Sequence, residues 1–408
     1  MKILEVNKYN YPRGGADKYF LDITEALRSA GHEVAVFSMR HPKNLPSPWE
    51  KYFVSRVSYN EPKLRDRLIA PGRMIYSLEA VKKFKQLIKD FKPDVIHLHN
   101  IYHQLSPSII AVAKKAKIPV IMHLHDYKLF CPNHTLYTKK QICHKCFKHN
   151  YYEAVLNKCF NNSWPQSLGV CLEMYIHHCL WKVYERDVNL FITPSAFMKE
   201  VALKFDWPVN KFKVLRNFSD PKLLEAPLQS PRGDYLLYAG RLSAEKGIKV
   251  LLKALKFDSS LKLKIAGSGP EEARLRNLAK ALEVEKQVKF LGQLDKSQLD
   301  LAIADARALI IPSVWLENMP LILLEALSAG KIVIASRLGG FKEIIKDGHN
   351  GFLFEANNPK ALAETIKTAL SADAEAIAIT ARKTASEMPL DKHLAELLKF
   401  FQGVIDKR

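Results

Sequence analysis

The chain has 408 residues, of which 48% are hydrophobic and 25% are charged. This composition excludes an intrinsically disordered protein, and the length exceeds what one hydrophobic core usually organises, so we expect two domains. No apolar run is long enough to span a membrane, and the opening MKILEVN is typical of a strand rather than a signal peptide, so the expected location is the cytoplasm.

The net charge of +20 is unevenly distributed, because residues 1–210 carry 31 Lys and Arg against 18 Asp and Glu. Such an excess favours an anionic partner: nucleic acid, a phosphorylated substrate or the headgroups of a membrane. A solvated lysine surface is the simpler alternative, and charge alone does not choose among these.

Apolar runs of strand length alternate with amphipathic helical patterns along the chain. They span residues 2–7, 33–38, 94–99, 118–125 and 189–194 in the first half, and 235–240, 262–267, 288–292, 308–312 and 332–336 in the second. Continuous apolar strands separated by helices are typical of parallel sheets covered on both faces. We therefore predict an α/β fold of two doubly wound domains in tandem, each with about five strands.

A stretch rich in Pro, Asn and Ser at 206–233 indicates the boundary between these domains. We expect an N-terminal domain over 1–210, with a cysteine-rich insertion near 128–165, and a C-terminal domain over 211–388. A last amphipathic helix within 389–408 is expected to pack back towards the N-terminal domain.

Residues 61–92 predict an amphipathic helix with many lysines. The apolar stripe comprises Met74, Leu78, Val81, Phe84, Ile88 and Phe91, and the lysines largely outside it are Lys82, Lys83, Lys85 and Lys89. One interpretation is a packed helix with a solvated basic face. The other is peripheral docking to the anionic inner face of a membrane.

The insertion has cysteines at the spacing of a metal site. Cys143 and Cys146 form a C-x2-C pair between Cys131 and Cys159, which together could hold one structural zinc ion. The alternative ligands are His134, His144 and His149. Unligated thiols in a loop are the alternative to metal binding.

Two loops after strands of the second half suit a nucleotide. In YAGRLSAEKGI, Arg241 and Lys246 stand beside glycines. A guanidinium, an ammonium and backbone N–H groups together suit a pyrophosphate. An ordinary surface pair of Arg and Lys would give the same pattern. In AGSGPEE, Gly267 lets the backbone approach a ligand closely.

The segment ENMPLILLEAL carries two carboxylates in an apolar context. Pro320 is expected at the first helical position, which leaves the following N–H groups available to an anion. Glu325 lies inside this helix and Glu317 precedes it, so both can accept hydrogen bonds from sugar hydroxyls. A capping or solvent-facing carboxylate would explain Glu317, but it explains Glu325 poorly, because its neighbours are apolar.

As an ordered set, these motifs resemble retaining glycosyltransferases of the GT-B architecture, specifically family 4. Glu317 and Glu325 match the E-x7-E motif, and AGRLSAEKG, AGSGPEE, VKFLG and GGFKEIIKDGHNGFLF are similar to the donor-domain signatures. YPRGGADKYFLDITEALRSAGHEVAVF, DVIHLHN and HLHDYKLFCP resemble the N-terminal ones. The family implies two Rossmann-like domains facing a central cleft, with a nucleotide-sugar donor on the C-terminal domain and a glycan or lipid-linked acceptor on the N-terminal domain.

The resemblance also implies residue roles. Arg241 and Lys246 would neutralise the diphosphate, Glu325 would bind the ribose and Glu317 the sugar. The implied catalytic residues are His125, Arg241, Lys246 and Glu317. The implied donor-binding residues are Gly15, Arg241, Lys246, Gly267, Glu317, Asn318, Met319, Pro320 and Glu325. Gly14 and Asp126 would contact the acceptor, while Asn217, in RNFSD where the family often has Asn-Gly, has no assigned role.

The implied reaction is metal-independent, retaining hexosyl transfer in bacterial cell-surface polysaccharide biosynthesis. No Asp-x-Asp follows a donor-domain strand, and two fixed cations with a helix dipole can replace a divalent cation, so no cofactor is expected for catalysis. Two other classes stay open. A nucleic-acid-binding protein would explain the charge, but the sequence contains no recognisable binding module. A nicotinamide dehydrogenase would share the fold class, but NYPRGGADKY lacks the G-x-G-x-x-G fingerprint.

Overall fold

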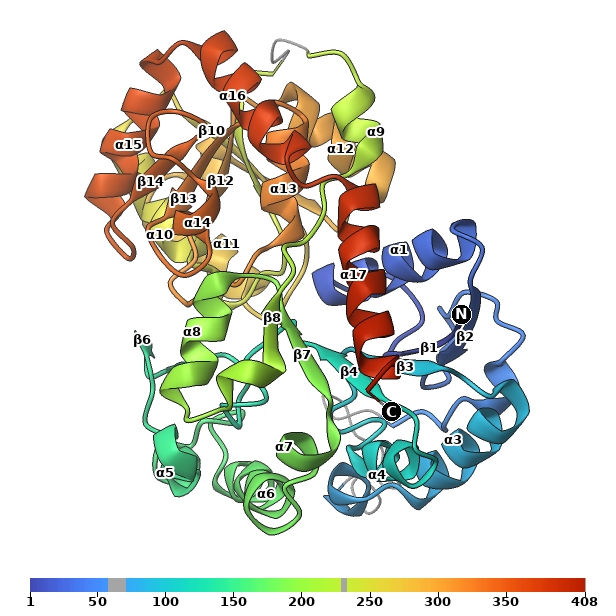
Figure 1. Ribbon diagram of the computed structural model, residues 1–408. Helices are drawn as coiled ribbons and strands as arrows, with labels where there is room; N and C mark the ends of the chain where they lie inside the picture. Colours follow the sequence, from blue (N-terminus) through green and yellow to red (C-terminus); the bar gives the residue numbers. More distant parts are fainter. Residues whose placement is uncertain (58–70, 229–232, 408) are drawn as a thin grey trace. The chain divides into compact units, whose positions relative to one another are not determined.

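The computed structural model describes residues 1–57, 71–228 and 233–407, and the chain divides into two compact α/β units (Figure 1). The N-terminal unit comprises Met1–Thr138, Cys143–Leu215 and Leu394–Arg408, and the C-terminal unit comprises Lys139–Ile142 and Arg216–His393. The change from one unit to the other thus falls between residues 215 and 216, inside the stretch where the sequence indicates a boundary.

The N-terminal unit contains a parallel six-stranded sheet in the order β2-β1-β3-β4-β7-β8. Its strands are β1 (Lys2–Val6), β2 (Glu33–Phe37), β3 (Val95–Leu98), β4 (Val120–His123), β7 (Leu190–Thr193) and β8 (Phe212–Val214). The first five strands lie within the predicted apolar runs. Strand β8 was not predicted, because it is a three-residue edge strand inside the Pro- and Asn-rich stretch.

The C-terminal unit contains a second parallel six-stranded sheet, in the order β11-β10-β9-β12-β13-β14. Its strands are β9 (Tyr235–Ala239), β10 (Lys262–Ala266), β11 (Val288–Gly292), β12 (Ala308–Ile311), β13 (Ile332–Ser336) and β14 (Phe352–Phe354). Only β14, another short edge strand, was not predicted. The order is that of a Rossmann sheet, in which the connection reverses direction between β9 and β12.

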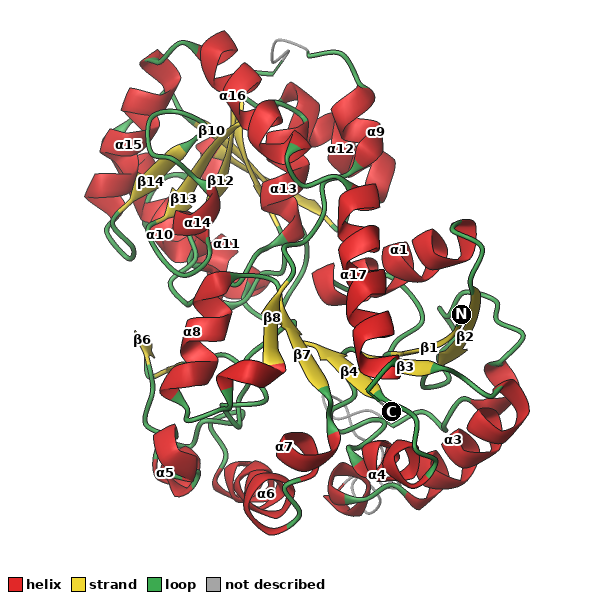
Figure 2. Cartoon of the chain, viewed as in Figure 1, coloured by secondary structure: helices red, strands yellow, loops and turns green. Residues whose placement is uncertain are grey.

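Helices cover both faces of the N-terminal sheet (Figures 1 and 2). Its helices include α1 (Gly15–Ser29), α3 (Leu78–Phe91), α4 (Ser108–Lys115), α5 (Tyr152–Leu156), α6 (Trp164–Met174), α7 (Val183–Asp187), α8 (Ala196–Lys204) and the end of α17 (Leu390–Ile405). Helices α1 and α17 lie on one face, and α3, α4 and α7 lie on the other. Phe401 of α17 packs against His97 of β3, with ring centroids 5.3 Å apart, so the chain ends on the N-terminal sheet.

Two hydrophobic clusters sandwich the C-terminal sheet. One joins the sheet to α10, α11 and α15, and the other joins it to α12, α13 and α16. The helices of this unit include α9 (Pro221–Glu225), α10 (Ile248–Ala254), α11 (Glu272–Ala281), α12 (Lys296–Asp305), α13 (Leu321–Ser328), α14 (Phe341–Ile344), α15 (Pro359–Ser371) and α16 (Ala374–Ser386). Because helices cover both faces of the sheet, β12 and β13 are buried along their whole length, and their sequences are therefore continuous apolar runs.

The apolar face of α3 differs from the predicted stripe. The buried residues are Ala80, Phe84, Leu87, Ile88 and Phe91. Leu78 is 77% exposed, because at 100° per residue it points roughly 130° away from the centre of the buried face. Residues 61–70 of the predicted helix lie outside the described part of the chain. Within the described part, no helix is both long enough and apolar enough to span a bilayer.

Candidate active site

In the C-terminal sheet the strand order reverses between β9 and β12. This topological switch point brings the loops after these two strands together. These strands pair over only two positions, Ala308 with Leu236 and Leu309 with Leu237, so they separate towards their carboxyl ends. In doubly wound sheets, ligands bind in the crevice that such a separation opens. The two loops that the sequence singles out for cations and carboxylates therefore lie at the expected ligand position of this fold.

A buried carboxylate and a lysine meet at this point. Lys246 Nζ donates to Glu317 Oε1 at 2.7 Å, and Ser313 Oγ donates to the same oxygen at 2.7 Å. Glu317 is 4% exposed, and a carboxylate so buried is tolerated only when it is paired and hydrogen-bonded. The family resemblance assigns Lys246 to the diphosphate and Glu317 to the sugar, but the structure couples the two residues directly.

The backbone of residues 317–320 is fixed by contacts from two other segments. Gly340 N–H donates to the Glu317 carbonyl at 2.8 Å, and the Asn217 side-chain amide donates to the Met319 carbonyl at 2.8 Å. A Cβ on Gly340 would lie 1.6 Å from the Asn318 carbonyl oxygen, and one on Gly339 would lie 2.2 Å from that of Glu317. Glycine is therefore required here for close backbone packing, and Asn217 acquires a role as a support of this loop.

Helix α13 begins one residue later than the sequence predicts. Pro320 has extended backbone angles and is the N-cap, so Leu321 is the first helical residue. Glu325 is 6% exposed inside the helix, and Lys296 Nζ of α12 lies 3.8 Å from its Oε1. Burial by itself would lower the pKa of Lys296, but its hydrogen bond with Asp300 and the charge of Glu325 raise it. A cation thus accompanies the buried Glu325 carboxylate.

The glycines after β9 and β10 pack the two loops against each other. A Cβ on Gly267, whose φ is +131°, would lie 2.0 Å from the Gly240 carbonyl oxygen, and one on Gly269 would lie 2.3 Å from that of Leu242. This gives Gly267 a packing role, and its contact with a ligand stays a prediction. Arg241, in the loop so formed, is exposed to solvent.

In the N-terminal unit, His125 belongs to a buried chain of hydrogen bonds behind the ends of β1, β3 and β4. His125 Nε2 contacts His99 Nδ1 at 2.9 Å, His99 Nε2 contacts Glu5 Oε2 at 2.8 Å, and His97 Nδ1 contacts Glu5 Oε1 at 2.9 Å. Burial lowers the pKa of His99 to about 4 and that of His125 well below its ordinary value. Burial would raise the pKa of Glu5, but the charge and hydrogen bonds of His97 and His99 lower it to about 2. The network orients the His125 ring.

The glycine loop of the N-terminal unit leads directly into α1. Gly14 is the N-cap and Gly15 the first helical residue, and the first turn includes Asp17, whose Oδ1 accepts a hydrogen bond from Asn7 Nδ2 at 2.9 Å. Asp126 follows His125, and its Oδ1 accepts from the Lys128 backbone at 2.9 Å. Burial raises the pKa of both carboxyl groups.

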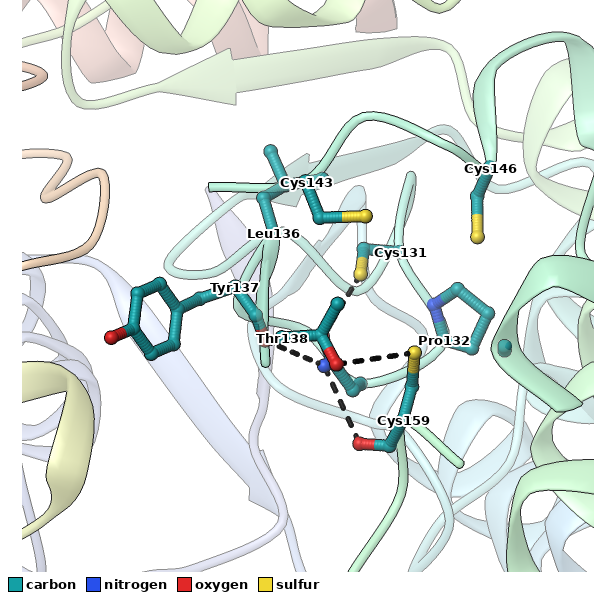
Figure 3. A pocket seen from close by; sticks show the side chains of 10 residues that line it. Cys131, Pro132, Leu136, Tyr137, Thr138, Cys143, Cys146 and Cys159 are labelled. Carbon is teal, nitrogen blue, oxygen red and sulfur yellow. Dashed lines mark hydrogen bonds between the residues drawn. The ribbon is translucent and has the colours of Figure 1, made fainter. Parts of the chain in front are cut away.

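The cysteine-rich insertion follows β4. It contains β5 (Tyr137–Thr138), β6 (Gln141–Ile142), the short helix η2 (Phe147–His149) and α5. The four cysteines that the sequence groups together line one small cavity (Figure 3). All six cysteines of the chain are thiols in the structure, and Cys171 and Cys179 lie elsewhere, in α6 and in the following π-helical turn (Tyr175–Leu180).

Sequence reasoning missed three contributors to the C-terminal site. Ser313, Gly339 and Gly340 all contact the Glu317 loop, as does Lys246, which the sequence predicts to bind phosphate. The double glycine opens the motif GGFKEIIKDGHNGFLF, but its role depends on which backbone it faces. Its position three residues after the end of the buried strand β13 is the one local signal of a tight turn.

Solved structures with the same two-unit arrangement of parallel sheets define the class. The Anabaena protein HepE, in complex with UDP and glucose, aligns with a TM-score of 0.69 at 20% identity, covering 99% of this chain and 100% of that one. The fold is therefore GT-B. Among curated relatives, an uncharacterized 42.6 kDa protein in the cps region of Klebsiella pneumoniae is 24% identical over 371 residues, or 87% of this chain and 90% of that protein. Glycogen synthase of Mycobacterium tuberculosis is 26% identical over 400 residues, or 92% and 87%.

Family models match both units. The model for Glycosyltransferase Family 4 matches residues 13–223, and that for Glycosyl transferases group 1 matches residues 222–384. The chain belongs to glycosyltransferase family 4. It is a glycosyltransferase of the GT-B type, and the nucleic-acid-binding and dehydrogenase alternatives are not favoured.

Proposed function

We propose that the protein transfers a hexose from a nucleotide-sugar donor to a glycan or lipid-linked glycan acceptor, with retention of configuration and without a catalytic metal. The single observation that supports this best is the Lys246–Glu317–Ser313 cluster at the switch point of the C-terminal sheet. HepE was solved in complex with UDP and glucose, which supports a nucleotide-sugar donor. A relative lies in a cps region, which is consistent with cell-surface polysaccharide biosynthesis as the pathway.

The donor would bind with its diphosphate at Arg241 and Lys246. One N–H of the Lys246 ammonium donates to Glu317 Oε1, which holds the ammonium group in place beside the loop where the phosphate would bind. With Oε1 so engaged, Glu317 Oε2 is the oxygen that would accept hydrogen bonds from the sugar hydroxyls. Glu325, in the second turn of α13, would accept from the two ribose hydroxyls, and the backbone of Asn318, Met319 and Pro320 would surround the sugar and phosphate.

In the proposed reaction, an acceptor hydroxyl forms a bond to the anomeric carbon as the bond from that carbon to the phosphate oxygen breaks. The acceptor proton passes to the departing diphosphate on the same face of the sugar, so neither glutamate acts as a nucleophile. Fixed cations and helix N–H groups aimed at the leaving group stabilise the charge that develops there. For the N-terminal residues we keep the roles that the family resemblance implies. His125 would act in catalysis, Gly15 would bind the donor, and Gly14 and Asp126 would contact the acceptor.

Nucleotide titration tests the donor assignment. We expect UDP, ADP or GDP to bind, followed by a matching nucleotide-sugar, whereas NAD and duplex DNA do not. Glu325→Gln should weaken nucleotide binding by about 10- to 100-fold, the scale for a hydrogen bond to a charged group. The matched control is Glu364→Gln, because Glu364 pairs with Lys360 on the surface of α15. No nucleotide binding in calorimetry, or equal affinities for both variants, would contradict the proposal. Turnover that persists in EDTA and NMR of the product anomer test metal independence and retention.

Vesicle binding tests the acceptor side. On α3, Lys82, Lys85 and Lys89 are exposed, whereas Lys83 pairs with Glu79 and donates to the Phe53 carbonyl. We therefore propose that the three exposed lysines contact anionic lipid at the membrane that carries the acceptor. Replacing them together by glutamine should lower affinity for anionic vesicles by about 1 kcal/mol per lysine and remove the salt dependence. The charge-matched control replaces Lys360, Lys367 and Lys383 of the C-terminal unit. Equal sedimentation of both triple variants with vesicles would leave these lysines as solvated surface.

A further inference from the structure

Four cysteine side chains surround a single cavity of about 10 Å³ in the N-terminal unit (Figure 3). Cys131 comes from the loop after β4, Cys143 follows β6, Cys146 is the N-cap of η2, and Cys159 follows α5. Their sulfurs are directed into the same space. A cavity of this size holds one water-sized occupant and no larger molecule.

We propose that Cys131, Cys143, Cys146 and Cys159 bind one zinc ion as thiolates. The C-x11-C-x2-C-x12-C spacing supplies four sulfur ligands, which is the number in a closed tetrahedral zinc site. Soft sulfur ligands select zinc over Mg²⁺ or Ca²⁺, which prefer oxygen. Each thiol releases its proton to solvent when its sulfur binds the ion. The site is independent of the proposed sugar transfer.

The backbone around the cavity is arranged to support sulfur ligands. The Cys131 thiol donates to Asn133 Oδ1 at 2.9 Å, and the backbone N–H groups of Asn133 and Leu136 are directed at the same sulfur. Such N–H groups stabilise a thiolate bound to a metal. Cys143 N–H donates to the Leu136 carbonyl at 2.8 Å, so the C-x2-C pair is tied to the same turn that surrounds Cys131. Leu136 therefore links two of the four ligands through its backbone.

The histidines that the sequence offers as alternative ligands are placed elsewhere. The ten described residues that line the cavity include the four cysteines and no histidine. His149 Nδ1 contacts the Tyr151 hydroxyl at 2.9 Å, and the His144 ring packs near Phe205. The ligand set is accordingly four sulfurs rather than a mixture of sulfur and nitrogen.

The insertion has little else to hold it together. Between residues 134 and 162, nine residues other than glycine have positive φ: His134, Leu136, Lys139, Lys140, Lys148, His149, Lys158, Asn161 and Asn162. Such backbone is unfavourable for L-residues and persists only where other contacts impose it. The fully buried apolar side chains in the same range are few, mainly Leu136, Tyr151 and Ala154. Small irregular segments of this kind are commonly stabilised by a metal.

Zinc binding would contract the cluster. Among the described residues, no three of these sulfurs all lie within 4.8 Å of one another. In a tetrahedral site with Zn–S bonds of about 2.3 Å, the sulfurs are about 3.8 Å apart. The metal should therefore tighten residues 131–159, and metal-free protein should be cut by protease there while residues 216–393 remain intact.

Metal analysis of the tag-free full-length protein is the direct test. We expect about one equivalent of zinc after gel filtration, and we expect Co²⁺, added to the chelator-treated protein, to give the intense absorption of tetrahedral cobalt thiolate. Cys143→Ser should lose the zinc and the cobalt spectrum. Cys179→Ser, which removes a thiol outside the cavity, should retain both.

Three results would overturn the proposal: zinc far below one equivalent with no cobalt thiolate spectrum in folded wild-type protein, one equivalent retained by both serine variants, or disulfides joining the four cysteines in freshly purified protein. Because the first measurement uses wild-type protein, the test does not depend on the variants folding. Nucleotide affinity should be the same in Cys143→Ser and wild type, which separates this test from that of the donor site.

Discussion

Replacing Lys246 by alanine should lower turnover by at least ~100-fold, the scale for removing one preorganised group that stabilises a developing anion. Lys246 donates to Glu317 at 2.7 Å and lies over the Trp315 ring, 5.0 Å from its centroid. Because these contacts fix the position of its ammonium group, a flexible side chain nearby would not supply an equivalent charge. The loss should appear in kcat/KM with the nucleotide-sugar. Arg241→Ala should act in the same direction.

The matched control is Lys253→Ala, which removes an exposed lysine from the nearby helix α10 and should leave turnover unchanged. Because Lys246 and Glu317 share a hydrogen bond, the combined Lys246→Ala and Glu317→Gln variant should lose less activity than the product of the single losses. Near-wild-type rates in both Lys246→Ala and Arg241→Ala would refute the phosphate assignment. Strictly multiplicative losses would contradict the coupling.

Gly340→Ala should have an effect of similar size without removing any functional group. Its Cβ would lie 1.6 Å from the Asn318 carbonyl oxygen, and because that oxygen belongs to the backbone, the loop of residues 317–320 must move. A displacement of about 1 Å at a reacting centre can lower turnover about 100-fold. We therefore expect a loss of at least that size, together with a lower melting temperature of the C-terminal unit, measured by calorimetry.

Two other glycines separate the possible causes. Gly403 in α17 has open space for a Cβ, so Gly403→Ala should raise stability by about 1 kcal/mol with normal turnover. Gly348 has a φ of +78° and also has open space, so Gly348→Ala should lower stability by about 1 kcal/mol from backbone strain alone. If Gly340→Ala proves as active as Gly348→Ala, the close packing of the loop is not what holds the site.

Several features of the fold follow from local patterns. Ten apolar runs predict ten strands, because a strand buried on both faces must be apolar over its whole length. The strands that were not predicted are β8 and β14 at the edges of the two large sheets and β5 and β6 in the insertion. Each has only two or three residues, too few to show a periodic pattern. The apolar stripe of α3 was wrong at Leu78, because several apolar residues fit a helical period but only one face contacts the sheet.

The position of the helix start at Pro320 shows a second limit. Proline is common at the first helical position because its fixed φ suits the helix, and the sequence predicts it there. Pro320 instead has a ψ of 134° and precedes the helix. Its φ of −69° is compatible with both places, so the neighbouring contacts of the loop decide between them.

The sequence by itself determined the fold class, the family and the residue types that gather at strand ends, because local apolar periods and short motifs are enough to indicate them. The order of the strands, which makes β9 and β12 neighbours, required the tertiary structure. So did the contact of Lys246 with Glu317 across 71 positions, the packing of Gly340 against Asn318 and the common cavity of the four cysteines. Such contacts depend on the pairing of segments far apart in the chain, and their partners leave no local pattern at either end.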